Sequence, residues 1–385
     1  MLRKTDKKNH LILLLLSALL GLTFSLTSLA ANKSVVSKTL PVWHNSQLPK
    51  QSSLRGSAIM GNSLWVSGTN NTVFVSQDGG KTWQDKSPQL PLAITLNTDY
   101  RDIALFNNNT AIIMGVGSAE KSVLFKTIDG GDTWQLLYQN TDKQGFFDSI
   151  AFWNEQQGLL LGDPVEGYYV IKKTLDGGKT WQRVAKTSLP KKLKNEGAFA
   201  ASGNTLIVGK NFIIGKEKQA WITTGGLSAS IYISKDAGKS WQRQAIPLYK
   251  NTTTAGGYAL ALNNSDANGQ QIFALGGDYK QREKSYPNIT IYADKHWLKS
   301  KSGQHGLRTA MSCLQNICIA TGKTSSDISF DDGITWQILP NVNKPNSNKP
   351  NNEQGFYTLA ADNSLFLAAG EKGKVAILKI FKTNM

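Results

Sequence analysis

The chain contains 385 residues and carries a formal net charge of +16 at pH 7, with hydrophobic and charged fractions of 40% and 18%. This composition excludes an intrinsically disordered chain, because disorder combines low hydrophobicity with high charge. The 35 glycines and 10 tryptophans argue against a helical protein and favour an all-β protein with many short strands and tight turns.

Residues 1–30 have the pattern of a cleavable signal peptide. A basic region around Arg3 and Lys4 precedes an apolar run over residues 11–20, and small residues precede Ala31, as signal cleavage requires. The apolar run is short for a membrane span, and the alternative to cleavage is an uncleaved anchor. We therefore expect an exported protein, periplasmic or secreted, with no transmembrane segment after cleavage. Losing four positive charges and one negative charge reduces its net charge from +16 to about +13.

The positive charge is carried mostly by lysine, since the chain has only seven arginines. The lysines are scattered through turn sequences, and the sequence contains no basic helix or nucleic-acid-binding motif, so we expect no nucleic-acid partner. Two interpretations of the charge remain. It is either a solvated surface, or it attracts an acidic protein or an anionic membrane surface.

One eight-residue pattern, Ser/Thr-x-Asp-x-Gly-x-Thr/Ser-Trp, recurs along the chain and is always followed by Gln. The five copies occupy residues 76–83, 127–134, 174–181, 234–241 and 329–336, and a degenerate sixth copy ends at Trp297. An apolar strand precedes each copy and another strand is expected to follow it. Each copy is therefore predicted to be the turn of a β-hairpin.

The residue types of this pattern suit a tight turn. Asp accepts hydrogen bonds from turn amides, Gly supplies a positive φ, and Trp packs between neighbouring sheets. One acid per copy cannot form a calcium cage, so no metal site is expected. The residues with this structural role are Asp78, Asp129, Asp176, Asp236, Asp331, Trp83, Trp134, Trp181, Trp241 and Trp336.

Repeats of about 40–60 residues with four short strands each predict a β-propeller. Aligning the first strands gives seven blades, at residues 52–90, 100–140, 147–187, 196–247, 256–300, 306–340 and 356–381. The seventh blade contains three strands. Residues 39–45, in which Trp43 matches the Trp of the pattern, are expected to supply its fourth strand. Closing the ring in this way removes exposed strand edges, so residues 31–385 are predicted to form a single propeller.

The two cysteines, Cys313 and Cys318, flank a four-residue hairpin in the sixth blade. Export places them in an oxidising compartment, so we predict a local disulfide. Their spacing excludes a Cys-x-x-Cys redox site, and two cysteines are too few for a zinc site.

The predicted fold brings two sets of positions to one mouth of the central channel: the start of each first strand and the turn after each second strand. The candidate binding residues at this mouth are Arg55, Arg101, Asp102, Asp148, Asp163, Glu196, Lys210, Asp278, Tyr279, Arg308 and Tyr357, with Gly257 as the aligned position in the fifth blade. Lys323, in the turn after the second strand of the sixth blade, belongs to the same predicted cluster. Arginine in such a place can contact a carboxylate or phosphate through two parallel hydrogen bonds. The alternative is a salt-bridge network that satisfies itself and closes the channel.

The eight-residue pattern resembles the Asp-box, or bacterial neuraminidase, repeat. Further passages, at residues 100–103, 147–153, 162–167, 196–203 and 276–279, resemble the exported propellers grouped with the photosystem II assembly and stability factors. This resemblance implies a non-catalytic, seven-bladed scaffold without a cofactor that binds a protein or membrane-complex partner. It also implies that Arg55, Arg101 and Arg308 are the counterparts of an arginine patch used for partner binding. We expect the protein to be a monomer.

Other Asp-box propellers are glycoside hydrolases, which gives the alternative function. The residues available for a sialidase-like site are the carboxylate-binding Arg55, Arg101 and Arg308, the nucleophile Tyr357, the base Glu196 and the acid Asp148. A polysaccharide hydrolase would instead pair Asp148 with Asp163 or Glu196. The arginine that follows Leu54 lacks the Phe/Tyr-Arg-Ile-Pro signature of sialidases, which are also six-bladed. No dinucleotide-binding motif supports an oxidoreductase. We therefore expect no catalytic residue.

Overall fold

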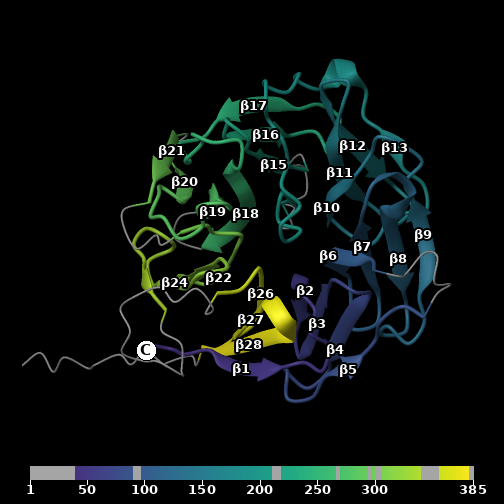
Figure 1. Ribbon diagram of the computed structural model, residues 1–385, viewed down its shortest axis with the longest axis vertical. Coiled ribbons are helices and arrows are strands. Elements are labelled where there is room, and N and C mark those ends of the chain that lie inside the picture. The colour runs from purple at the N-terminus through teal and green to yellow at the C-terminus, as the bar shows by residue number, and fades with distance from the viewer. Residues whose placement is uncertain are drawn as a thin grey trace, which may run out of the picture. The chain divides into compact units, whose positions relative to one another are not determined.

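The computed structural model describes residues 40–89, 97–209, 218–265, 269–293, 296–300, 306–339 and 355–380. The predicted signal peptide and the candidate binding residue Lys210 lie outside these ranges. The described residues belong to one compact unit. They form seven four-stranded antiparallel sheets arranged as the blades of a ring (Figure 1). The predicted seven-bladed, all-β propeller is therefore confirmed.

The strands of each blade follow one another from the channel outwards. Blade 1 contains β2 (Leu54–Met60), β3 (Ser63–Gly68), β4 (Thr72–Ser76) and β5 (Gln84–Asp85). Blade 2 contains β6 (Asp99–Leu105), β7 (Ala111–Val116), β8 (Val123–Thr127) and β9 (Gln135–Gln139). Blade 3 contains β10 (Phe147–Phe152), β11 (Gly158–Val165), β12 (Tyr168–Thr174) and β13 (Gln182–Arg183). Blade 4 contains β14 (Leu206–Val208), β15 (Ala220–Thr224), β16 (Ser230–Ser234) and β17 (Gln242–Ala245).

The remaining blades have the same plan. Blade 5 contains β18 (Ala255–Ser265), β19 (Gly269–Asp278), β20 (Ile289–Ala293) and β21 (His296–Lys299). Blade 6 contains β22 (Ala310–Leu314), β23 (Ile317–Thr321), β24 (Ser326–Ser329) and β25 (Gln337–Ile338). Blade 7 contains β26 (Thr358–Asp362), β27 (Leu365–Ala369), β28 (Lys374–Lys379) and β1 (His44–Gln47). Three short 3₁₀ turns are η1 (Ala119–Lys121), η2 (Lys186–Ser188) and η3 (Glu371–Gly373).

The N-terminal strand closes the ring, as predicted. β1 pairs antiparallel with β28, with His44 opposite Ile377. The strand runs over His44–Gln47 rather than residues 39–45 because Trp43 occupies the place of the motif Trp, and every outer strand after a full motif begins one residue later. The Trp43 side chain is buried, and its ring centroid lies 5.3 Å from that of Phe356. Strands from near both ends of the described chain thereby contribute to one blade, which completes its four-stranded sheet.

All five Asp-box turns share hydrogen bonds between the Asp carboxylate, the Ser or Thr two residues before it, and the Thr or Ser four residues after it. In the first box, Asp78 Oδ1 accepts from the Lys81 and Thr82 amides, both at 2.9 Å, and Oδ2 accepts from the Thr82 hydroxyl at 2.7 Å. Ser76 Oγ donates to Asp78 at 2.7 Å and accepts from the Gly80 amide at 2.8 Å. In the second box the same bonds lower the pKa of Asp129 to about 2. The hydrogen bonds within the turns occupy both oxygens of the Asp carboxylates, which agrees with their predicted structural role.

The box tryptophans pack between blades. Trp134 of blade 2 lies with its ring centroid 6.3 Å from that of Trp65 in blade 1, and its Nε1 donates to the Lys86 carbonyl at 2.7 Å. Seven apolar clusters occupy the seven gaps between neighbouring blades, counted over the described residues. The degenerate sixth copy differs, because Trp297 lies within β21 rather than before it, and the start of that copy is outside the described residues.

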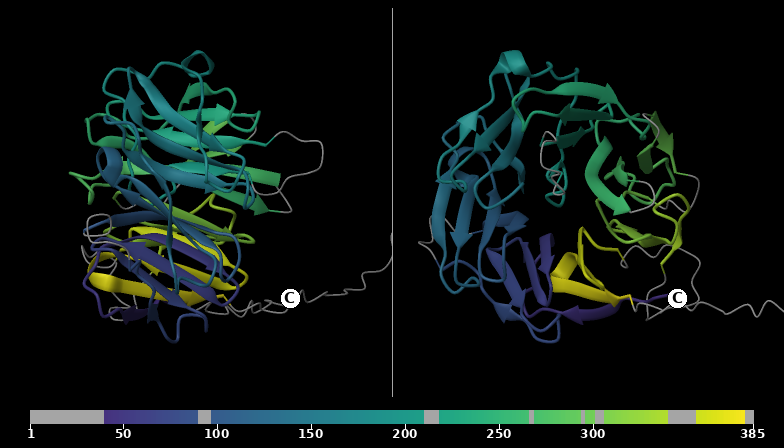
Figure 2. Two further views of the ribbon diagram at one scale, coloured as in Figure 1. Left: turned by 90° about the vertical axis from the view of Figure 1, so that its right-hand side faces the viewer. Right: turned by 180° about the vertical axis from the view of Figure 1, so that it is seen from behind.

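The first strand of blade 4 is not where the sequence predicted it. The first strand expected at the beginning of the predicted blade 196–247 is absent from the described sheets, and β14 (Leu206–Val208) takes its place. Residues 196–205, which we call the channel strap, run inside the ring (Figures 1 and 2). The strap hydrogen bonds to four other blades: Arg101 donates to its Ala200 carbonyl, Ser149 to Gly203, the Leu260 amide to Asn204, and its Ser202 hydroxyl to the Thr309 carbonyl. The channel is therefore partly filled by the chain itself.

The strap fits closely against the channel wall at Gly203. Gly203 has φ +73°, and a Cβ there would lie 2.4 Å from the carboxyl carbon of Asp102. The path of the strap depends on this close packing and on hydrogen bonds to distant blades. Neither can be predicted from the local pattern of apolar residues that indicates a strand.

Cys313 and Cys318 are paired residues of β22 and β23 and form a disulfide. Within the described ranges, no helix is long and apolar enough to cross a membrane.

Candidate functional site

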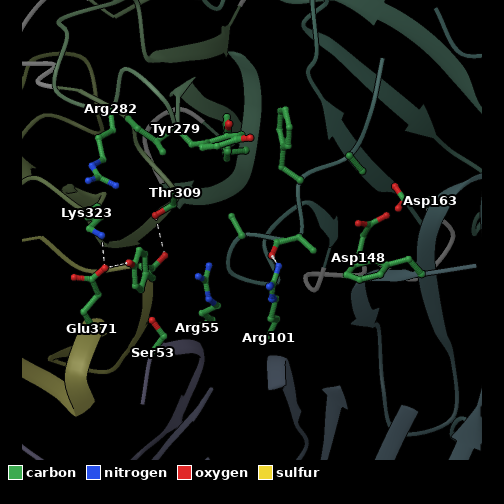
Figure 3. A pocket seen from close by; sticks show the side chains of 18 residues that line it. Ser53, Arg55, Arg101, Asp148, Asp163, Tyr279, Arg282, Thr309, Lys323 and Glu371 are labelled. Atoms are coloured by element: carbon green, nitrogen blue, oxygen red, sulfur yellow. Dashed lines mark hydrogen bonds and ion pairs between the residues drawn. The ribbon is translucent and has the colours of Figure 1, made fainter. Parts of the chain in front are cut away.

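A cavity of about 600 Å³ opens at one mouth of the channel. Its walls come from six of the seven blades, and the channel strap contributes Ala198, Phe199, Ala200 and Ala201 in the place of blade 4. The other lining residues are Ser53, Arg55, Arg101, Phe146, Asp148, Asp163, Tyr258, Tyr279, Arg282, Leu307, Thr309, Lys323, Tyr357 and Glu371 (Figure 3). Seven of the predicted mouth residues therefore meet here: Arg55, Arg101, Asp148, Asp163, Tyr279, Lys323 and Tyr357.

Register shifts in the first strands position the pocket residues. The pairing of β2 with β3 skips Arg55, that of β6 with β7 skips Arg101, and that of β10 with β11 skips Asp148. A residue left out of the ladder in this way is re-aimed relative to the strand. In blade 5 the skipped residue is Tyr258, so the predicted position Gly257 was wrong by one residue.

A signal in the sequence could have located Tyr258. The residue before each skipped position pairs with a glycine at the end of the second strand, as Leu54 does with Gly68 and Tyr100 does with Gly115. Gly257 pairs with Gly276 in the same way. Anchoring the alignment on these glycines, rather than on the first strand alone, places Tyr258 at the mouth.

The three predicted arginines have different environments. Arg55 lies with its guanidinium carbon 4.8 Å from the ring centroid of Tyr357, and burial followed by the nearby charge of Arg101 lowers its pKa. Arg101 Nε donates to Asp99 Oδ2 at 2.8 Å, and Nη1 donates to the Ala200 carbonyl at 2.7 Å. The charge of Arg101 is therefore balanced by Asp99, whereas Arg55 has no ion pair among the described residues.

Arg308 does not reach the pocket, so its predicted place at the mouth is corrected. Its side chain is fully buried, and Nε and Nη2 both donate to Asp327 Oδ2, at 2.9 and 2.6 Å. Ser325 Oγ accepts a further bond from Nη2 at 3.0 Å. Asp327 lies on the third strand of the blade, and its ion pair with the guanidinium replaces the contacts with water that Arg308 would make at the channel mouth.

Arg282 is the basic residue that the sequence analysis missed. It lies in the turn region after β19 and lines the pocket, and its charge is among the causes that lower the pKa of Glu371. No ion pair of Arg282 occurs within the part of the chain that the structure describes. Nothing in the local sequence distinguishes Arg282 from an exposed loop residue, because its position depends on the path of the chain between β19 and β20.

Lys323 and Glu371 form an ion pair at the same end of the pocket, and the Tyr357 hydroxyl donates to Glu371. Lys323 Nζ also lies 5.9 Å from the ring centroid of Tyr357. Burial and the contact with Glu371 raise the pKa of Tyr357. Tyr357 is therefore a neutral hydrogen-bond donor engaged by Glu371.

Two carboxyl groups form the opposite end of the pocket. Asp148 is 2% exposed, and its Oδ2 is buried without a hydrogen-bond partner among the described residues. Asp163 lies on the neighbouring strand, at a second register shift between Gly162 and Pro164. Burial and then the charge of Asp163 raise the pKa of Asp148 well above its ordinary value, and burial raises the pKa of Asp163. Figure 3 shows this acidic pair at one end, Arg282 and Lys323 at the other, and Arg55 and Arg101 between them.

Three predicted acids are structural and do not line the pocket, which corrects their predicted place. Asp102 accepts hydrogen bonds from Ser149 Oγ at 2.9 Å and the Ile150 amide at 2.8 Å, and burial raises its pKa to about 7. Glu196 accepts from Thr224 and Tyr232 hydroxyls at 2.6 and 3.0 Å. Asp278 accepts from Thr252 and Thr254 hydroxyls at 2.7 and 2.6 Å. Nearby hydroxyls and amides thus satisfy each of these carboxyl groups.

Some charged side chains of the pocket are thus paired with one another, and others remain available to a ligand. Arg101 and Lys323 are paired with acids, whereas Arg55, Arg282, Asp148 and Asp163 have no ion pair within the described ranges. The described residues include no cluster of metal-ligating side chains. Such an arrangement offers hydrogen-bond donors for an anion at one end and acceptors for a cation at the other.

The fold and its turns define the protein as a seven-bladed Asp-box propeller. The sequence profile described as BNR/Asp-box repeat matches residues 74–85, and the profile described as Photosynthesis system II assembly factor YCF48 matches residues 88–205. The resemblance to the photosystem II assembly factor family, predicted from the sequence, is confirmed. The chain has no significant match among curated proteins.

Solved structures of similar fold include both binding proteins and an enzyme. YCF48 bound to D1 peptide is 16% identical over 90% of this chain and 100% of that chain, with a TM-score of 0.60. YCF48 from Cyanidioschyzon merolae is also 16% identical, over 88% and 99% of the two chains, with a TM-score of 0.60. The GH74 enzyme of Niastella koreensis is 13% identical over 87% of this chain and 53% of its own, with a TM-score of 0.59. At these identities the likeness concerns the fold.

Proposed function

We propose that this protein is a non-catalytic, exported scaffold that binds a carboxylate-bearing segment of a protein partner in the channel-mouth pocket. The observation that carries the proposal is the pair Arg55 and Arg282. Both are partly buried, both line the pocket, and neither has an ion pair among the described residues. Partly buried arginines favour carboxylates because two parallel N–H groups match the two oxygens.

The pocket is large enough for a short peptide segment. A volume of about 600 Å³ is within the range of about 300–1,000 Å³ typical of ligand pockets. Tyr258, Tyr279 and Phe199 add aromatic walls, and Phe199 stacks on Tyr258 with ring centroids 4.3 Å apart. A propeller of similar fold holds a D1 peptide, which supports a protein partner for this chain as well.

The test is direct peptide binding to the mature protein. An array of pentapeptides attached through their N-termini, with free or amidated C-termini and with or without Asp and Glu, is probed with the protein. We expect binders to carry a carboxylate. Selected peptides are then measured in solution by calorimetry with wild type and with the double variant Arg55→Ala/Arg282→Ala.

The double variant should lose about a hundredfold or more in affinity, since it removes at least two charged hydrogen bonds that each contribute about 1.5–3 kcal/mol. The matched control is Arg183→Ala/Arg243→Ala, which removes two arginines from the outer strands β13 and β17 with the same change in net charge. Equal affinities of both double variants and wild type for carboxylate peptides would show that the arginines do not form the site.

Export is part of the same proposal and has its own measurement. Mass spectrometry of the protein recovered from fractionated cells should give an N-terminus at Ala31 and no residues 1–30. Recovery of the full chain in the cytosolic fraction would argue against an exported scaffold.

Glycoside hydrolysis is the second candidate function. The GH74 neighbour and the adjacent carboxyls of Asp148 and Asp163 favour it. The sialidase roles fit poorly, because Arg308 is buried on Asp327 and Glu196 is bonded to Thr224 and Tyr232. Turnover of a panel of fluorogenic glycosides by the wild type, abolished in Asp148→Asn, would replace the binding proposal with an enzymatic one.

A further inference from the structure

The acidic end of the pocket contains a carboxylate that the protein leaves unsatisfied. Asp148 is 2% exposed, and its Oδ2 has no hydrogen-bond partner within the described residues. Most buried carboxyl oxygens in folded proteins find a donor, so one without a donor that lines a cavity calls for an explanation. Asp163 of the next strand lies beside Asp148 at the same end of the pocket (Figure 3).

The protein itself provides no cation that neutralises this pair. Arg101 is the basic residue whose charge acts on Asp148, but its Nε bonds to Asp99 and its Nη1 bonds to the Ala200 carbonyl. Neither Asp148 nor Asp163 has an ion pair among the residues that the structure describes. Burial and the charge of a neighbouring carboxylate both disfavour the ionised form of a carboxyl group, so an unneutralised pair lowers the stability of the folded protein. Groups perturbed in this way are typical of binding sites.

We propose that Asp148 and Asp163 form a subsite for a protonated amine or guanidinium of the bound segment. This inference rests on the proposed function and deepens it. The cation would come from a lysine or arginine side chain or from an N-terminal amine, and its N–H groups would complete the bonding of Asp148 Oδ2. The neighbouring aromatic ring of Phe146 offers an apolar surface for the stem of a long basic side chain.

The two ends of the pocket together select a segment with both charges. A carboxylate at Arg55 and Arg282 and a cation at Asp148 and Asp163 place each charge against its opposite, whereas a purely acidic segment would face the acidic pair with a like charge. Like-charge contacts of this kind discriminate against wrong partners. The partner segment is therefore one that carries a basic group a short distance from a carboxylate.

The experiment uses one carboxylate-bearing pentapeptide selected on the array and a set of its single-position variants. Each position is replaced in turn by Lys, Arg or Gln, and each peptide is made with a free and with an acetylated N-terminus. Calorimetry with the mature protein measures the ratio of Lys or Arg to Gln affinity at each position. At one position we expect Lys or Arg to bind at least tenfold more tightly than Gln. A preference for the free N-terminus over the acetylated one would instead identify a terminal amine as the cation.

The variant Asp148→Asn/Asp163→Asn should abolish this preference, so that the Lys or Arg peptide and the Gln peptide bind it with affinities equal within about twofold. Asp142→Asn/Glu166→Gln is the matched control, because it removes two carboxylates that pair with Arg183 and Lys186 outside the pocket, and it should retain the preference. Thermal unfolding checks that both double variants fold.

The outcomes separate the two proposals. Peptides that bind through Arg55 and Arg282 but show no preference for a cation, or a preference that survives in Asp148→Asn/Asp163→Asn, overturn the subsite and leave the proposed function standing. Absence of carboxylate-dependent binding by any peptide overturns both.

Discussion

Replacing Asp102 by Asn should change how the stability of the protein depends on pH. Asp102 is buried beneath the channel strap, and burial raises its pKa from an ordinary value of 3.8 to about 7. Between these two values the folded protein holds a proton that the unfolded chain releases. The contribution of Asp102 to stability is therefore complete below pH 4 and falls as the pH rises to about 7.

The size of this fall follows from the two pKa values. A difference of about three pKa units corresponds to about 4 kcal/mol, since one unit is 1.36 kcal/mol. The substitution also has a constant cost. Asp102 accepts bonds on both oxygens, from the Ile103 amide at 2.9 Å and from Ser149 and Ile150, and Asn has only one oxygen. Losing one acceptor costs about 1–3 kcal/mol.

The two terms predict that the order of stability reverses. Asp102→Asn should be less stable than wild type at pH 4 and more stable at pH 8. Urea unfolding followed by tryptophan fluorescence at pH 4, 5, 6, 7 and 8 measures the difference. Glu120→Gln, at an exposed position, is the control and should track the wild type at every pH.

The Asp-box carboxylates act in a different pH range and do not confuse the comparison. The bonds within the turns lower the pKa of Asp129 and Asp176 to about 2, so their contribution is present above pH 4 and lost below it. They are also unchanged in the variant. Parallel curves for wild type and Asp102→Asn between pH 4 and pH 8 would refute the reasoning that burial controls this group.

Three further substitutions test the packing. Gly203→Ala should destabilise by about 2 kcal/mol or more, because its backbone has φ +73° and a Cβ would meet the Asp102 carboxyl, whereas Gly61→Ala, with φ +58° and open space, should cost about 1 kcal/mol. Arg308→Ala should cost about 3–5 kcal/mol, since it leaves the Asp327 carboxylate buried and unpaired; a loss below 1 kcal/mol would contradict this. Cys313→Ser should cost about 2 kcal/mol for so short a loop and should make urea unfolding insensitive to reductant.

The sequence determined the propeller because its organising signals are local and repeated. Each Asp-box contains its own hydrogen-bond acceptor, its own Gly at positive φ and its own Trp, so five copies can be recognised without knowing their neighbours. Trp43 shows the strength of this signal. A single residue in register with the box tryptophans was enough to predict that an N-terminal strand completes the seventh blade, although the strand bounds needed the structure.

The binding pocket was only partly predictable. Arg55, Arg101 and Asp148 could be found because they occupy one position of a repeated strand. Tyr258 was missed by one residue, since an extra residue in a strand shifts the register without changing the strand pattern. Arg282 was missed altogether because it belongs to no repeat.

Only the tertiary structure decided which charges remain available to a ligand. Arg308 and Arg101 occupy the same position of the aligned first strands. Arg308 is buried in an ion pair with Asp327, whereas Arg101 pairs with Asp99 and donates to the carbonyl of Ala200 in the channel strap. The strap itself is a predicted strand that instead bonds to four other blades. Whether a charge is paired depends on residues far away in the chain, and the free energy of a buried ion depends on all of its neighbours at once. Local sequence therefore specifies the ring of blades, whereas contacts across the channel specify its site.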